Sequence, residues 1–238
     1  TQGKLQLGNG GTTGAVASSV IHNNGTLVVD RSNTAVLSQV IDGTGSVVQA
    51  GSGTTVLSAD NTYTGTTTVQ SGVLEVEGAI ASSTVNVLSG AALVGTGTAG
   101  SMSVATGATL APTGTRGVLN VQGNLEMNDG ATLSVHENHQ PSGTTMAVYG
   151  QTYQQLYSGR VAVSGSTALT GTLNVNVIPG TFLKSHEYYT LITSSGGFSS
   201  KTDALQSNLL SLYTFISPSL YYTGNDLDLL LYRNNVTF

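Results

Sequence analysis

Residues 68–76 read Thr68-Val69-Gln70-Ser71-Gly72-Val73-Leu74-Glu75-Val76, two short runs of alternating residues joined at a glycine. Because successive side chains of a β-strand point to opposite faces, Leu74 and Val76 are expected to point inward, and Glu75 and Glu77 outward. The same phrase, a glycine followed within a few residues by Leu or Val, returns at Gly25, Gly45, Gly53, Gly72, Gly90, Gly107, Gly123 and Gly130. With the copies at Gly45 and Gly130 set aside, the spacing between successive glycines from Gly53 to Gly123 shortens slightly with each copy.

This drifting period of about 18 residues predicts the fold class. It is too short for a propeller blade or a helical hairpin repeat, but it fits one coil of a β-solenoid with three short strands and three turns. Glycines can supply the positive-φ corners of such a coil, and Thr and Ser suit stacked outer faces because they carry no charge. We therefore expect an all-β, single-stranded parallel β-helix with Val and Leu in a narrow interior.

The composition agrees with this fold and excludes several function classes. Only 8% of the 238 residues are charged, 39% are hydrophobic and 31 are glycine. So few Lys and Glu residues argue against helix bundles and doubly wound α/β enzymes. The net charge of −5 and the scattered basic residues give no electrostatic footprint for nucleic acid. Without cysteine there is no disulfide, thiolate metal site or cysteine nucleophile.

Aromatic residues divide the chain near Met146. Of the ten Tyr and four Phe residues, only Tyr63 precedes that position. A thin solenoid interior has little room for large rings, whereas an uncapped solenoid leaves its interior and its strand edges open. We therefore predict β-helix coils in residues 1–145 and an aromatic-rich capping region in residues 146–238.

Two parts of the chain resemble a known family. Residues 57–69, Leu57-Ser58-Ala59-Asp60-Asn61-Thr62-Tyr63-Thr64-Gly65-Thr66-Thr67-Thr68-Val69, followed by residues 72–76, resemble the passenger-associated transport repeat of bacterial type V autotransporters, with Ala59 where the repeat often has glycine. The C-terminal part is similar to the conserved end of such passengers in residues 157–165, 169–175, 188–197, 218–222 and 225–229.

This resemblance implies a right-handed parallel β-helix that ends in an autochaperone, or pertactin-like, domain. It also implies a cell-surface or secreted protein that crosses the periplasm and the outer membrane, with its own outer-membrane β-barrel as partner. In this family the C-terminal end emerges first and nucleates folding of the rest. Large buried side chains would supply that nucleus, and the candidates are Tyr188, Tyr189, Leu191, Phe198, Leu220, Tyr221 and Leu229.

Three motifs resemble chemical sites but are better explained by structure. Residues 95–100, Gly-Thr-Gly-Thr-Ala-Gly, match a dinucleotide fingerprint in letters, but a strand pattern follows, which predicts a turn. In His136-Glu137-Asn138-His139 the second His comes one position too early for the zinc motif H-E-x-x-H, so we predict a surface loop. The acid pairs Glu75/Glu77 and Asp226/Asp228 are predicted to be solvated strand faces, so paired catalytic carboxylates are not expected.

The remaining candidates for binding are three tyrosines. Tyr149, Tyr153 and Tyr157 recur every four residues, which fits a short helix or an irregular loop, and they are the aromatics most expected to be exposed. We expect a non-catalytic passenger segment of the adhesin or virulence type, without cofactor or metal. Two alternatives stay open: a module that binds host or bacterial surfaces or associates with itself, and a solenoid glycan lyase or hydrolase.

Overall fold

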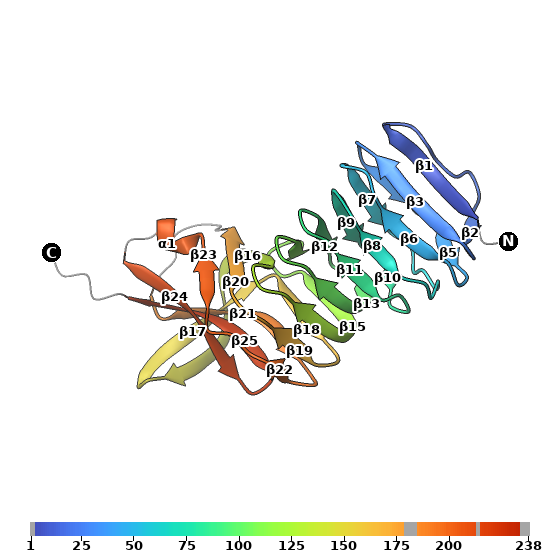
Figure 1. Ribbon diagram of the computed structural model, residues 1–238. Helices are drawn as coiled ribbons and strands as arrows, with labels where there is room; N and C mark the ends of the chain where they lie inside the picture. The colour runs from blue at the N-terminus through green and yellow to red at the C-terminus, as the bar shows by residue number, and fades with distance from the viewer. Residues whose placement is uncertain (1–2, 179–184, 213–214, 234–238) are drawn as a thin grey trace.

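The computed structural model describes residues 3–178, 185–212 and 215–233. Short strands stack along one axis as successive coils, and the first and last strands, β1 and β25, lie toward opposite ends of the stack (Figure 1). The strand pairs between coils are parallel, so the prediction of an all-β parallel solenoid is confirmed.

Each coil contributes to three ladders of strands, which form three faces of the solenoid. The first face contains β2 (Val20–His22), β5 (Val40–Asp42), β10 (Ala79–Ile80), β13 (Thr98–Val104), β15 (Val118–Met127), β18 (Arg160–Val163) and β21 (Glu187–Ser194). The second contains β1 (Lys4–Gly11), β3 (Thr26–Arg31), β6 (Ser46–Gln49), β8 (Thr67–Val69), β11 (Val85–Val87), the second halves of β13 and β15, β19 (Thr167–Leu169) and β22 (Phe198–Ser200). The third contains β4 (Ala35–Leu37), β7 (Thr54–Leu57), β9 (Val73–Val76), β12 (Ala92–Gly95), β14 (Thr109–Pro112), β16 (Thr132–Val148), β20 (Leu173–Ile178) and β23 (Leu205–Ser207).

The interior is built from the alternate, mostly aliphatic residues of each strand, such as Leu74 and Val76 of β9 or Val85 and Val87 of β11. On the third face Leu74 pairs with Leu93, Leu93 with Leu110 and Leu110 with Leu133, and all four are fully buried. Each such side chain contributes about 1.5–3 kcal/mol of apolar burial. Glu77 is exposed and Glu75 is half-buried on the opposite side, so the alternation expected for residues 74–77 is confirmed.

The glycine repeat marks one corner of the coil. Gly72, Gly90, Gly107 and Gly130 precede the third face and have φ angles of 63°, 79°, 74° and 73°, a region that favours glycine. The prediction that Gly123 continues this series is wrong. Because Thr109 pairs with Thr132, the glycine that follows Gly107 at this corner is Gly130.

The C-terminal part leaves the simple coil pattern. β16 continues past the third face and forms an antiparallel hairpin with β17 (Gln151–Ser158), and β17 runs parallel to the first half of β21. β25 (Asp226–Arg233) pairs antiparallel with the other edge of β21, and β24 (Ile216–Thr223) pairs with β25. We call β16, β17, β21, β25 and β24 the C-terminal sheet, which lies at the end of the stack (Figure 1). Helix α1 (Leu209–Leu212) precedes β24, and no helix in the described ranges could span a membrane.

Candidate functional site

Strand β21 joins the solenoid to the C-terminal sheet and carries three of the predicted nucleus residues. Tyr189 and Leu191 are buried in the main core, together with Leu229 of β25, whereas Tyr188 points to the other face of the sheet. Phe198 of β22 and Leu220 of β24 are partly buried against the main core. Six of the seven predicted nucleus residues thus lie in β21, β24 and β25 and pack on both faces of the C-terminal sheet, whereas Phe198 lies in β22 on the second face of the solenoid. Their role in folding stays a prediction.

The outer face of the C-terminal sheet carries a second, smaller apolar cluster. Val148, Tyr153, Tyr188 and Leu230 are buried there, with Met146 and Tyr221 packed against them. We call these six residues the outer cluster. They come from all five strands of the sheet, so the cluster ties the β16–β17 hairpin to β21, β25 and β24.

The expectation that Tyr149, Tyr153 and Tyr157 lie exposed on a short helix or an irregular loop is only partly met. They lie on no helix or irregular loop: Tyr153 and Tyr157 are in strand β17, and Tyr149 is in the turn before it. Tyr149 is 92% exposed, but Tyr153 is buried in the outer cluster and Tyr157 is half-buried. The expected exposure is therefore wrong for Tyr153, because the alternation of a strand turns its ring onto the sheet.

A chain of side-chain hydrogen bonds crosses the same face beside the outer cluster. The Ser142 hydroxyl donates to Gln155 Oε1 at 2.7 Å, and Gln155 Nε2 donates to Thr190 Oγ1 at 2.9 Å. Thr190 Oγ1 donates to Asp228 Oδ1 at 2.7 Å, and Thr223 Oγ1 donates to Asp228 Oδ2 at 2.9 Å. These five residues, the cross-strand polar chain, connect every strand of the C-terminal sheet.

The prediction that Asp226 and Asp228 form a solvated strand face is wrong for Asp228. Asp228 is buried, 2% exposed, and both of its carboxylate oxygens accept hydrogen bonds inside the sheet. Burial raises the pKa of this carboxyl, while the hydrogen bonds from Thr190 and Thr223 lower it by less and the charge of Asp226 raises it further. Asp226 is half-buried on the same strand, so the two acids do not face each other across a groove as glycosidase carboxylates do.

Asp228 gives the stability of the chain a predictable pH dependence. Because its pKa is higher in the folded than in the unfolded state, protonation stabilises the fold, and this contribution grows as the pH falls from 7 toward the unfolded pKa near 4. We expect Asp228→Asn to flatten the change of urea midpoint with pH over this range. The exposed control Asp203→Asn should keep the wild-type slope, and an unchanged slope in Asp228→Asn would contradict the assignment.

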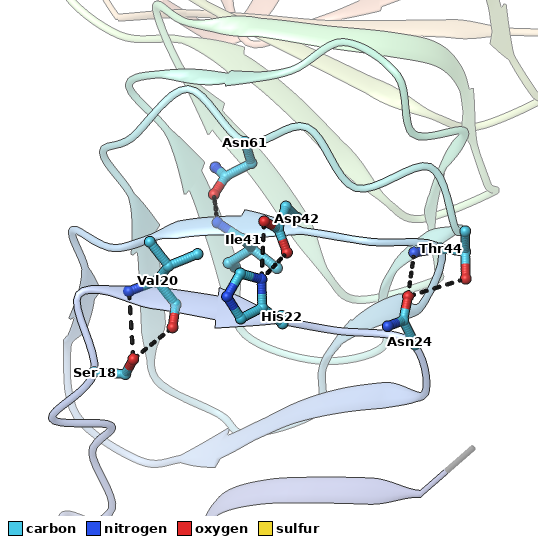
Figure 2. Close-up of polar contacts among 8 residues, drawn as sticks. All are labelled: Ser18, Val20, His22, Asn24, Ile41, Asp42, Thr44 and Asn61. Carbon is cyan, nitrogen blue, oxygen red and sulfur yellow. Dashed lines mark hydrogen bonds and ion pairs between the residues drawn. The ribbon is translucent and has the colours of Figure 1, made fainter. Parts of the chain in front are cut away.

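The segment around Asn61 uses a side chain where the first face lacks a strand. Between β5 and β10 this face has only an isolated bridge from Asp60 to Ala79. Asn61 is buried, its Oδ1 accepts from the Ile41 amide at 2.9 Å (Figure 2), and its Nδ2 donates to the carbonyls of Ala59 and Ala79 at 2.8 and 3.1 Å. The carboxamide therefore replaces the missing backbone partners and keeps this ladder continuous.

Tyr63 lies two residues further on and fills the interior at this coil. Its ring is fully buried, and its hydroxyl is 2.6 Å from Thr67 Oγ1, which is 2.7 Å from Ser83 Oγ. Ser83 donates to the carbonyl of Gly65 at 2.6 Å, so the donors run from Tyr63 to Thr67 to Ser83. Burial raises the pKa of Tyr63 to about 12, so the phenol stays neutral. No local sequence pattern predicts this arrangement, because Ser83 comes from the next coil.

Polar side chains of neighbouring coils pair with one another on the outer side of the described N-terminal strands. His22 Nδ1 lies 2.8 Å from Asp42 Oδ1 on the outer side of β2 and β5 (Figure 2). The Ser18 hydroxyl bonds the backbone of Val20 rather than His22, so no relay of Ser, His and Asp is present. Both side chains of the His22–Asp42 pair are exposed, 76% and 36%, and such pairs contribute little to stability. Asn24 and Thr44 form a similar contact between the same coils (Figure 2).

The other two motifs have structural explanations. No helix follows Gly95. A bend covers Thr96 and Gly97 between β12 and β13, and residues 98–100 already belong to β13, so the turn predicted for residues 95–100 is confirmed only at 96–97. The predicted loop at residues 136–139 is wrong, because these residues continue strand β16, and Glu137 is buried with an oxygen 3.4 Å from the Tyr189 hydroxyl. Within the ranges that the structure describes, no three His, Asp or Glu side chains are grouped as metal ligands.

The comparison with known families points to the segment that contains Asn61 and Tyr63. Residues 47–76 match the family model described as Passenger-associated-transport-repeat. This match supports an autotransporter passenger, and it covers the segment on which the first part of the resemblance rests. No curated protein is similar enough in sequence to be matched. The likeness of the C-terminal part to an autochaperone region stays a prediction.

Proposed function

We propose that this chain is a non-catalytic β-helical segment of a bacterial autotransporter passenger whose C-terminal sheet nucleates passenger folding during secretion. The passenger would be displayed on the cell surface or released, and its own outer-membrane β-barrel would be its partner in export. The repeat matched at residues 47–76 supports the passenger assignment. An adhesin or virulence role belongs to the whole passenger in this proposal, with the solenoid as its stalk.

The observation that carries the nucleation role is the pairing of the last coil. In the coils each strand pairs in parallel with the equivalent strand of the next coil, as Val85 does with Met102 and Met102 with Leu125. In contrast, β24 and β25 form a hairpin in which Thr223 pairs with Asp226. Local contacts cost little loop-closure entropy, so this hairpin can form before any coil.

The hairpin also supplies a template for the first coil. β25 covers one edge of β21 from Glu187 to Thr193, and the other edge of β21 pairs with β17 and β18. Once β21 is fixed, β18 has a strand to pair with, and each new coil then stacks on the one before it. Solenoid stability is a sum of coil and interface terms, so propagation from a stable end is physically reasonable.

A deletion in the full-length secreted passenger tests this proposal. Removing residues 209–233 takes away α1, β24 and β25 and leaves β21 with one unpaired edge. We expect the passenger to reach the surface of intact cells but to become sensitive to protease. The control removes residues 85–101, one coil, since Val85 and Met102 occupy equivalent positions on the second face.

The two outcomes separate folding from binding. The one-coil deletion should stay protease-resistant, because its remaining strands can stack in register. If the passenger without residues 209–233 also stays resistant, the nucleation role is wrong. If it stays resistant and loses adhesion to cells, the C-terminal sheet is instead the binding module, which is the alternative function.

A further inference from the structure

A bulge in the C-terminal sheet forms a small cavity that the folding role does not use. Leu156 of β17 pairs with Tyr189, and Val161 of β18 pairs with Ile192. Four residues, 157–160, therefore lie opposite only two residues of β21, 190 and 191. Such bulges redirect side chains and are common beside binding sites. Here Tyr157, Ser158 and Arg160 line a cavity of about 300 Å³ that also contacts Thr190, Thr193 and Asp226.

The cavity holds two opposite charges that do not pair with each other. Arg160 and Asp226 both line it and both are half-buried. No ion pair joins these two described residues, so the guanidinium and the carboxylate lie more than an ion-pair distance apart. Burial raises the pKa of Asp226, and the positive charge of Arg160 lowers it to a smaller extent.

One wall of the cavity is aromatic. Tyr157 lines it, and the guanidinium of Arg116 stacks on this ring with its central carbon 4.0 Å from the ring centroid. Arg116 also donates to Gln140 Oε1 at 2.7 Å, so the stacked group is held in place from β16. Arg116 does not line the cavity. The Tyr157 ring is therefore held by a guanidinium that lies outside the cavity.

The geometry points to a binding site for a neutral saccharide, of which one sugar ring fits between Tyr157, Arg160 and Asp226. A sugar presents hydroxyls that can donate to the Asp226 carboxylate and accept from the Arg160 guanidinium, and its C–H face packs on an aromatic ring. Arg160 and Asp226 carry opposite charges, so together they give the cavity no net charge that would select an anion or a cation. The volume is at the lower end of the range for small-molecule pockets, which suits a single ring.

Saturation-transfer NMR on the purified chain tests this site. The probes are free D-glucose, D-galactose, D-mannose and N-acetyl-D-glucosamine at millimolar concentrations. We expect at least one of them to receive saturation from the protein and to bind at least tenfold more weakly to Asp226→Asn and to Arg160→Gln. The exposed Asp203→Asn is the matched control and should bind like the wild type.

Thermal unfolding of each variant separates loss of the site from loss of the fold, so the outcome does not depend on the nucleation role. Lost binding with an unchanged unfolding midpoint supports the site. The proposal is overturned if no probe binds the wild type, if both variants bind it equally well, or if glycine, a zwitterion that could bridge the two charges, binds in place of every sugar.

Discussion

Replacing Tyr63 by alanine is expected to lower the free energy of unfolding by about 3–5 kcal/mol, the usual cost of removing a buried aromatic side chain. The ring is fully buried in a narrow interior whose other side chains are mostly aliphatic, so the cavity has no large neighbour to fill it. The substitution also removes the donor to Thr67. Urea unfolding followed by circular dichroism measures the change.

Two further variants divide this effect into its causes. Tyr63→Phe keeps the ring and should cost about 1–2 kcal/mol, because Thr67 and Ser83 still bond each other at 2.7 Å. Tyr149→Ala removes the same side chain from a position that is 92% exposed, and should change stability by less than about 0.5 kcal/mol. If Tyr63→Ala behaved like Tyr149→Ala, the repeat around residues 47–76 would not depend on this ring.

Much of the solenoid could be predicted from the sequence because its strands and corners are determined by residues that are adjacent in the sequence. The alternation at residues 74–77 and the corner at Gly72 depend on neighbouring residues and on φ, and both are as expected. The predicted glycine series was wrong at Gly123, because the coil there is longer than the coils before it. A glycine followed closely by Leu occurs at both Gly123 and Gly130, so the sequence pattern fits either position. Only the pairing of Thr109 with Thr132 decides between them.

The C-terminal sheet was harder to predict because its strands pair over longer and unequal distances. Gln155 meets Thr190 and Thr190 meets Asp228 across separations of 35 and 38 residues, and no periodicity marks those partners. The buried Asp228 looked like the outward half of an alternating strand. Its sheet, however, is covered on both faces, since the outer cluster and the main core lie on opposite sides. Alternation then separates two buried faces rather than a core from solvent.

Two matched substitutions, one in the coils and one in the C-terminal sheet, can measure which of these two parts folds first. Leu229 of β25 and Leu74 of β9 are both fully buried in the main core. Leu229→Ala and Leu74→Ala should each cost about 2–5 kcal/mol at equilibrium, as buried leucines do. If the C-terminal sheet forms first, Leu229→Ala must mainly lower the folding rate, whereas Leu74→Ala must mainly raise the unfolding rate.

We expect Leu229→Ala to slow refolding from urea by roughly tenfold or more, because contacts of a folding nucleus are largely formed in the transition state. Leu74→Ala should leave refolding nearly unchanged and accelerate unfolding instead, since its coil stacks later. Stopped-flow circular dichroism gives both rates from one series of urea jumps. A reversed pattern would place the nucleus in the coils. Equal slowing by both substitutions would mean that coils and C-terminal sheet form together, and in either case the sheet would not be the template on which the coils grow.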